Sequence, residues 1–142
     1  MRDVRKGLQH RDPATAARLM LRGSCRFWAS EYPIFKRVKS LAAVDPVIAE
    51  LDRLKEGVRE GHITNLVSRL ADAGQLKPGL TARRAGLLLL MLFSFEVFEQ
   101  LHIGGKLGAD AVAGELIAMA DARVLALPGE RQPQRDRAAA SA

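Results

Sequence analysis

The chain has 142 residues, 48% of them hydrophobic, which is enough for one domain with its own core. Aromatic residues make up only 5% while leucine and alanine are abundant, so the composition favours helices over sheets. The single cysteine, Cys25, excludes an internal disulfide and a cysteine-rich metal site, and it fits a reducing cytoplasm.

The net charge of +6 is concentrated near the start of the chain. Residues 1–40 carry ten Lys or Arg against three acids, a net of +7, whereas residues 41–142 have a net charge of −1. Such a basic end can face nucleic acid, or it can be a solvated helix surface behind an unfolded leader. The start lacks the apolar region of a signal peptide, and the longest nonpolar run, 85–93, is well short of the roughly 18 residues of a membrane span. We expect a cytoplasmic protein with no membrane partner.

Residues 1–11 are expected to be a basic leader or the remnant of a connecting helix. The first full helix should run from about Asp12, a good N-cap followed by Pro13, to Ala29. A break at 30–33 precedes a short second helix. The apolar stripes of these two helices comprise Met20, Leu21, Cys25 and Trp28 in the first and Ile34, Phe35, Val38 and Leu41 in the second.

The third expected helix begins at the Asp45 cap with Pro46 and stops at Gly74. Its stripe comprises Leu51, Leu54, Val58, His62, Leu66 and Leu70. A Pro-Gly turn follows, and Thr81 caps a fourth helix that should reach His102.

Two faces of this fourth helix are apolar when it is projected at 100° per residue. One side holds Met91, Phe95, Phe98 and His102, and the other holds Gly86, Leu89, Leu90, Phe93, Val97 and Gln100. A helix on a small domain normally keeps one wet face. The second dry face predicts either a partner chain or a single central helix surrounded by its own chain.

The last expected helix, 109–127, shows a similar pattern. Its core face comprises Val112, Ala113, Leu116, Met119, Ala120, Val124 and Leu127, and its back carries Ala111, Gly114, Ala118, Ala122 and Leu125. Small residues on the back permit close helix approach. The second apolar faces of the fourth and last helices therefore predict a homodimer in which two helices from each chain form a four-helix bundle. The polar, alanine-rich residues 128–142 are expected to be disordered.

The order of these elements resembles a known family. "RDPATAARLMLRGSCRFWASEYPIFKRV" is similar to the first two helices of the C-terminal domain of TetR-family transcriptional regulators, and "AGQLKPGLT" before an apolar helix ending in "SFEVFEQL" is the most specific match. The resemblance covers residues 12–127. It implies an all-α, five-helix bundle whose last two helices form the dimer, and a pocket for a small apolar or aromatic effector. In that family, effector binding changes the spacing of two N-terminal helix-turn-helix domains and releases operator DNA.

Only eleven residues precede Asp12, too few for the two helices of a helix-turn-helix. We expect the chain to lack that domain and to reach operator DNA only through a missing N-terminal domain. An engineered fragment, a late-assigned start and a natural truncation remain open. The competing class is a stand-alone helical dimerisation or interaction protein without ligand or DNA binding.

The expected ligand-binding residues point inward from different helices, and most could equally be ordinary core. They are Trp28, Phe35, His62, Leu66, Met91, Phe95 and Phe98. His62 could fix a ligand by a hydrogen bond, and Cys25 is expected to be a small core residue rather than a redox thiol. The three histidines show no metal-ligand spacing and no phosphate loop is present. We expect no catalytic residue, no metal and no cofactor, and hence no enzyme.

Overall fold

The structure, a computed structural model, describes residues 2–133, and within them the fold is all-α, as the composition predicts. The elements are α1 (Arg2–Gln9), α2 (Pro13–Ser30), α3 (Tyr32–Ala42), α4 (Pro46–Asp72), α5 (Ala82–Leu92), α6 (Phe95–Glu99), the π-helical turn η1 (Gln100–Gly104), α7 (Ala109–Arg123) and the 3-10 turn η2 (Pro128–Glu130).

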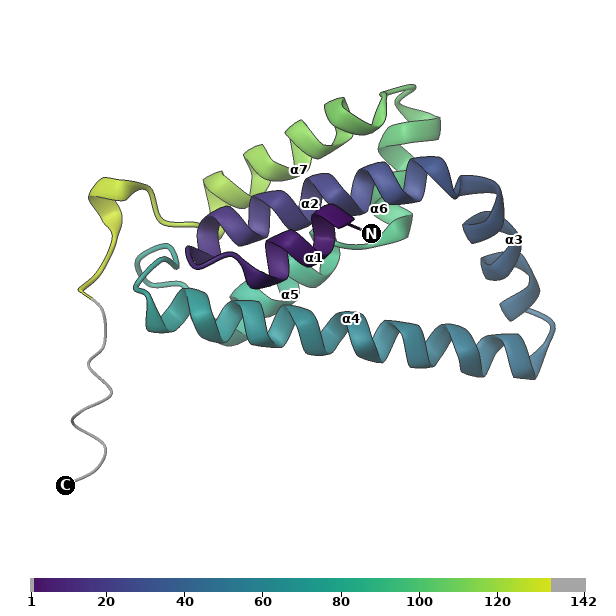
Figure 1. Ribbon diagram of the computed structural model, residues 1–142, viewed down its shortest axis with the longest axis horizontal. Coiled ribbons are helices and arrows are strands. Elements are labelled where there is room, and N and C mark those ends of the chain that lie inside the picture. The colour runs from purple at the N-terminus through teal and green to yellow at the C-terminus, as the bar shows by residue number, and fades with distance from the viewer. Residues whose placement is uncertain (1, 134–142) are drawn as a thin grey trace.

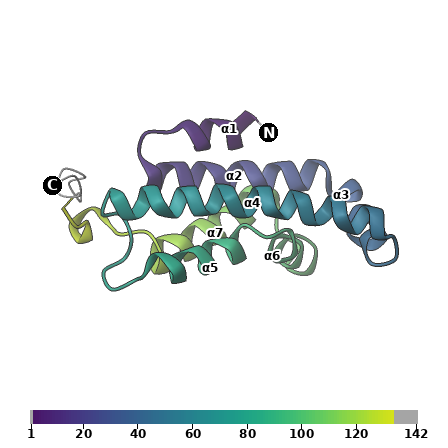
Figure 2. The ribbon, with the colours of Figure 1, turned by 90° about the horizontal axis from the view of Figure 1, so that it is seen from below.

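Helix α2 lies at the centre of the molecule and packs against α1 and α7 (Figures 1 and 2). Helix α4 runs along the whole length of the molecule, and α3 connects the end of α2 to the start of α4. The close approach of α1 to α2 requires Gly7, because a Cβ there would lie 2.6 Å from the Met20 side chain. The core is formed by α2, the second half of α4, and α5 to α7.

The start of α2 is fixed by the predicted cap and by a buried glutamine. Asp12 Oδ2 accepts a hydrogen bond from the Thr15 amide at 2.9 Å. Gln75, only 6% exposed, accepts from the Ala14 amide through Oε1 and donates to Asp12 Oδ1 through Nε2. Burial opposes ionisation of Asp12, but the hydrogen bonds from Thr15 and Gln75 outweigh it and lower the pKa of Asp12 to about 2. These contacts tie the loop after α4 to the start of α2.

The predicted continuous helix from Thr81 to His102 is interrupted. Helix α5 ends at Leu92, and the chain bends by 46° before α6. Ser94 is extended at ψ 143° and its Oγ accepts a hydrogen bond from the Val97 amide, so it caps a new helix inside the apolar run. The break resets the helical phase, which explains why one projection over 81–102 misassigned several faces.

Only the second half of the predicted α4 stripe is buried. Leu66 and Leu70 are in the core, whereas Leu51, Leu54 and Val58 are each more than half exposed. Helix α3 contains no buried residue, and Ile34 and Leu41, predicted to face inward, are exposed. The prediction of a buried stripe in the first half of α4 and in α3 is therefore wrong for this chain, because no further helix of residues 2–133 covers that end.

Helix α7 ends earlier than predicted. After Arg123 the chain extends, and Leu125 forms a single antiparallel bridge with Leu76. Met119 and Leu127, predicted for the core face, are exposed, while the rest of that face is buried. Of the predicted tail, Pro128–Glu130 form η2 beside the α4–α5 loop, with Gln132 N donating to Gly74 O; residues 134–142 lie outside the described part.

Within residues 2–133 no single helix is long and apolar enough to cross a membrane. The bent pair of α5 and α6–η1 passes such a test only when taken together, by length and composition alone.

Candidate ligand-binding cavity

A cavity of about 330 Å³ opens between α2, α3, α4 and the α5–α6 junction. Its volume lies at the lower end of the range for small-molecule sites, about 300–1,000 Å³. The apolar part of its lining comprises Val4, Met20, Phe27, Trp28, Phe35, Val58, Ile63, Phe93 and Phe95. Five of these side chains are aromatic, in a chain with only seven aromatic residues, so the aromatic content is concentrated here.

Ring packing gives the cavity wall a defined shape. Phe35 stacks on Phe95 with ring centroids 5.3 Å apart, and Phe27 meets Phe35 edge-on at 5.4 Å. Trp28 lies edge-on to Phe95 at 6.3 Å. These rings come from the end of α2, the start of α3 and the start of α6, so the chain breaks on either side bring them together.

Four of the seven predicted ligand residues line the cavity, namely Trp28, Phe35, His62 and Phe95. The other three do not. Leu66 and Phe98 are fully packed in the core, and Met91 is about half exposed (49%) on the outer side of α5. For Met91 the physical reason is the helix break at Ser94, because Met91 and Phe95 no longer share one helical face.

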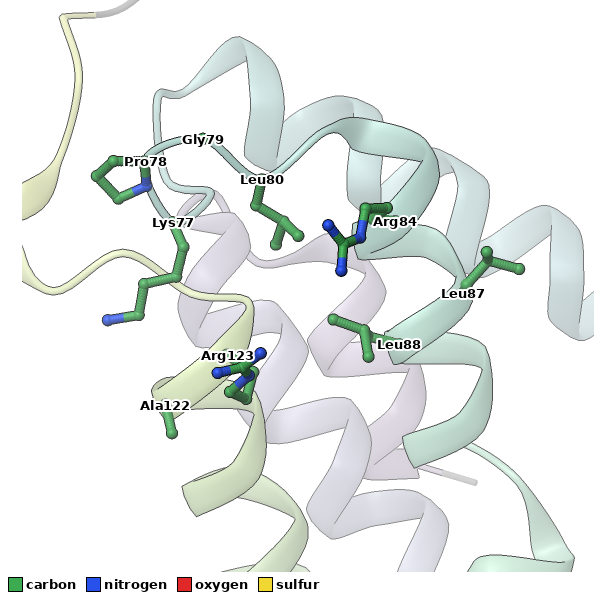
Figure 3. Close-up of a pocket in the computed structure, with 9 residues that line it drawn as sticks. All are labelled: Lys77, Pro78, Gly79, Leu80, Arg84, Leu87, Leu88, Ala122 and Arg123. Carbon is green, nitrogen blue, oxygen red and sulfur yellow. The ribbon is translucent and has the colours of Figure 1, made fainter.

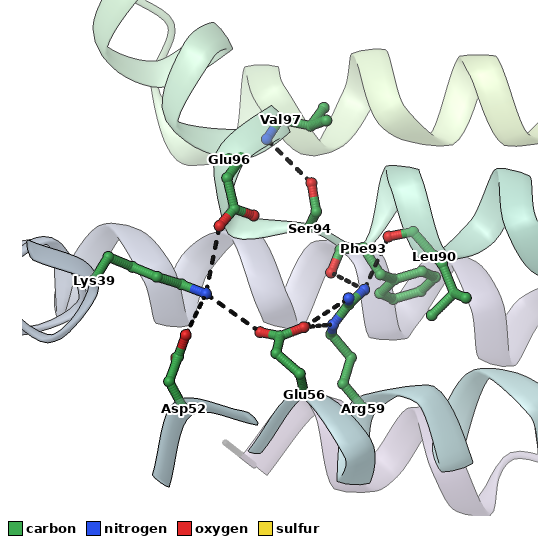
Figure 4. A network of polar contacts seen from close by, with 9 residues as sticks. All are labelled: Lys39, Asp52, Glu56, Arg59, Leu90, Phe93, Ser94, Glu96 and Val97. Atoms are coloured by element: carbon green, nitrogen blue, oxygen red, sulfur yellow. Dashed lines mark hydrogen bonds and ion pairs between the residues drawn. The ribbon is translucent and has the colours of Figure 1, made fainter. Parts of the chain in front are cut away.

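A network of charged side chains forms one rim of the cavity (Figure 4). Lys39 Nζ lies 2.9 Å from Asp52, 3.4 Å from Glu96 and 3.6 Å from Glu56. Burial opposes the charge on Lys39, but the hydrogen bond with Asp52 and the nearby carboxylates outweigh it and raise the pKa of Lys39. Each carboxylate of this group is within ion-pair distance of Lys39, so the group contains no unpaired ion, although one lysine does not balance three carboxylates. Sequence reasoning missed them, because the partners of Lys39 lie on two other helices, α4 and α6.

Arg59 joins this rim to the α5–α6 junction. Its Nη1 donates to the carbonyl oxygens of Leu90 at 2.8 Å and Phe93 at 3.1 Å, the free carbonyls where α5 ends. Its Nε donates to Glu56 at 2.7 Å. Arg59 itself lines the cavity, so a cavity residue directly holds the end of α5 in place.

The remaining polar lining is sparse. Lys55 Nζ lies 4.6 Å above the Phe35 ring, a cation–π contact, and His62 is exposed at the mouth. The cavity therefore offers stacking and apolar contact as its main interactions, with Ser24 and His62 as the neutral polar side chains of its lining.

Nothing in the described chain is arranged for metal or thiol chemistry. Within residues 2–133 no three His, Cys, Asp or Glu side chains are grouped to hold a metal ion. Cys25 is fully buried, and burial, with a smaller effect of Asp110, raises the pKa of its thiol to about 12. The thiol is thus protonated at neutral pH, and Cys25 is a core residue as predicted.

The outer faces of the helices from α5 to α7 contain part of the predicted dimer interface. Ala111, Gly114, Ala118, Ala122 and Gln100 are exposed, and Gly86, Leu90 and Val97 are partly exposed. Leu89, Phe93 and Leu125, also predicted for the interface, are instead buried in the chain's own core. Leu87 is exposed on α5, and Met91 and Met119, which the projections had placed on other faces, are exposed as well.

The chain matches no protein-family model, no curated protein and no solved structure.

Proposed function

We propose that this chain is the effector-binding and dimerisation domain of a TetR-like transcriptional repressor, sensing a small, mostly apolar ligand. The observation that carries the proposal is the aromatic-lined cavity of about 330 Å³ beside the α5–α6 junction. Its lining suits a flat, neutral aromatic molecule that stacks on Phe35, Phe95 or Trp28. Operator DNA would be contacted by a helix-turn-helix domain of the repressor, and this chain would supply no catalysis.

Arg59 supplies the proposed link between ligand and output. A ligand entering the cavity would meet Arg59 and Glu56, which together hold the end of α5. Any displacement of that pair would release the Leu90 and Phe93 carbonyls and shift α5 relative to α6. Because α5 carries half of the proposed dimer face, such a shift would alter how two copies pack.

The ligand proposal is tested by a thermal shift screen with neutral aromatic compounds of about naphthalene size. A ligand that binds only the folded chain raises its stability by RT ln(1 + [L]/Kd). Val58→Phe would project a ring into the cavity and should abolish the shift. Val47→Phe is the matched control, because Val47 is exposed on the same face of α4 but does not line the cavity. Shifts that persist in Val58→Phe would contradict the assignment.

The dimer proposal is tested by sedimentation of two double variants. Leu87→Glu with Met91→Glu places charge on the outer face of α5 and should give folded monomers. Leu51→Glu with Leu54→Glu does the same on α4 and should leave the dimer intact. If instead the α4 variant is monomeric and the α5 variant remains a dimer, the interface lies on α4.

One observation favours the alternative function, a helical interaction protein without a ligand. Val47, Leu51, Leu54 and Val58 are all exposed at spacings of four, three and four, the pattern of a coiled-coil seam. Monomers from the α4 double variant, together with no ligand-induced thermal shift, would support this class.

A further inference from the structure

A second cavity, of about 450 Å³, lies at the other side of the bundle, between the α4–α5 loop, the start of α5 and the end of α7 (Figure 3). It is separate from the aromatic cavity, with which it shares no lining residue. Its wall is held by the Leu76–Leu125 bridge and by the Lys77 amide, which donates to Val124 O at 2.8 Å. The loop is therefore fastened to the end of α7, and the cavity is part of the folded framework.

All the ionisable side chains that line this second cavity are cations: Lys77, Arg84 and Arg123. The Lys77 ammonium is already paired with Glu130 at 2.7 Å. The guanidinium groups of Arg84 and Arg123 make no ion pair and no hydrogen bond with any other residue of 2–133. An anion bound in this cavity would therefore meet two cationic side chains that no carboxylate of residues 2–133 already neutralises.

The rest of the lining is apolar. Leu80 and Leu88 are partly buried against the core, and Leu87 and Ala122 are exposed. Figure 3 shows Arg84 projecting from α5 toward the side on which Arg123 lies, with Leu88 nearby on α5. A ligand can therefore place a charged group at the two arginines and an apolar body along the leucines.

We propose that this second cavity binds a small monocarboxylic acid with an apolar body, such as a medium-chain fatty acid. Arginine is the side chain best matched to a carboxylate, because its planar fork donates two parallel hydrogen bonds. The leucines supply apolar contact for the chain. Leu87 and Ala122 also lie on the proposed dimer face, so the bound acid would sit at the edge of that face. This inference does not depend on the aromatic cavity.

The probe is decanoate, measured by isothermal titration calorimetry against the full chain. The uncharged 1-decanol and the short acetate are the matched ligands, and binding should require both the carboxylate and the apolar body. Arg84→Ala with Arg123→Ala should weaken decanoate binding about ten- to hundredfold, since hydrogen bonds to charged groups are lost. Arg84→Gln with Arg123→Gln should do the same and keeps the size of the side chains.

Arg83→Ala is the control variant, because Arg83 is in the same first turn of α5 but does not line this cavity. It should change the affinity less than about twofold. The fluorescence of Trp28, in the aromatic cavity, should stay constant during the titration. Equal binding in the double variants, equal binding of 1-decanol, or a saturating Trp28 signal that follows the calorimetric curve would each overturn the proposal.

Discussion

The two halves of α4 have similar patterns of apolar residues, but only the second half is buried. In the second half, Ile63, Leu66 and Leu70 are buried against α2 and α5, whereas in the first half Leu51, Leu54 and Val58 remain exposed. The first half packs on α3, which buries none of its own residues. An apolar stripe therefore shows which face of a helix is able to pack against the core. Whether that face is buried depends on other helices that cover it.

Leucine truncation in the two halves should give the largest contrast. Leu66→Ala, at a position 1% exposed, should lower the free energy of unfolding by about 2–5 kcal/mol. Leu54→Ala, at a position 53% exposed, should lower it by less than about 1 kcal/mol. Urea denaturation of both variants measures this contrast. Similar losses would mean that the first half of α4 is buried in solution, for instance by another chain.

The stability of the packed end, where the loop after α4 meets the start of α2, should also depend on Gln75. Gln75→Ala leaves the Ala14 amide buried without its acceptor and should cost about 1–3 kcal/mol. Gln9→Ala, at an exposed glutamine, should cost less than about 0.5 kcal/mol. If the two substitutions cost the same in urea denaturation, the contacts of Gln75 do not stabilise the packed end.

Acid should weaken the packed end through Asp12. Its folded pKa, about 2, is depressed below the usual value, so its stabilising contribution is full above pH 4 and is lost as pH falls toward 2. The contribution should be about 1–2 kcal/mol after allowing for solvent screening. The stability difference between the native chain and Asp12→Asn, measured from pH 7 to pH 2, should therefore shrink below pH 4. A difference that stays constant across this range would contradict the proposed hydrogen bonds.

Loss of the Ser94 hydroxyl at the α5–α6 junction should have the smallest effect on stability. Ser94→Ala removes the cap of α6 and should cost about 1 kcal/mol. Ser68→Ala, on the exposed side of α4, is the control and should be close to neutral. A neutral Ser94→Ala in thermal denaturation would mean that the break does not need the serine hydroxyl.

Features fixed by local chemistry could be predicted from the sequence. The caps at Asp12, Asp45 and Thr81 all accept backbone hydrogen bonds as expected, and Gly74 has the positive φ of 64° that a helix stop favours. The break at Ser94 could not be predicted so easily, because an unbroken apolar run is equally compatible with one long helix.

Only some of the cavity residues could be predicted from the sequence, for a related reason. Trp28, Phe35 and Phe95 stood out as aromatic residues expected to point inward from different helices, and His62 as the polar residue on an apolar stripe. The Lys39 and Arg59 contacts join helices far apart in sequence, and no periodicity encodes them. Similarly, the dimer prediction chose Leu89, Phe93 and Leu125 because a projection cannot tell the chain's own core from a partner.

The central claim is that the aromatic cavity holds a small apolar ligand, and Trp28 provides a direct measurement of it. Trp28 is the chain's single tryptophan and lines the cavity. A titration with 1-nitronaphthalene, a neutral aromatic quencher, should give a saturating loss of Trp28 fluorescence in the native chain and in Val47→Phe, and no saturable loss in Val58→Phe. Quenching that rises without saturation, and equally in all three proteins, would show only collision from solvent and would contradict the account.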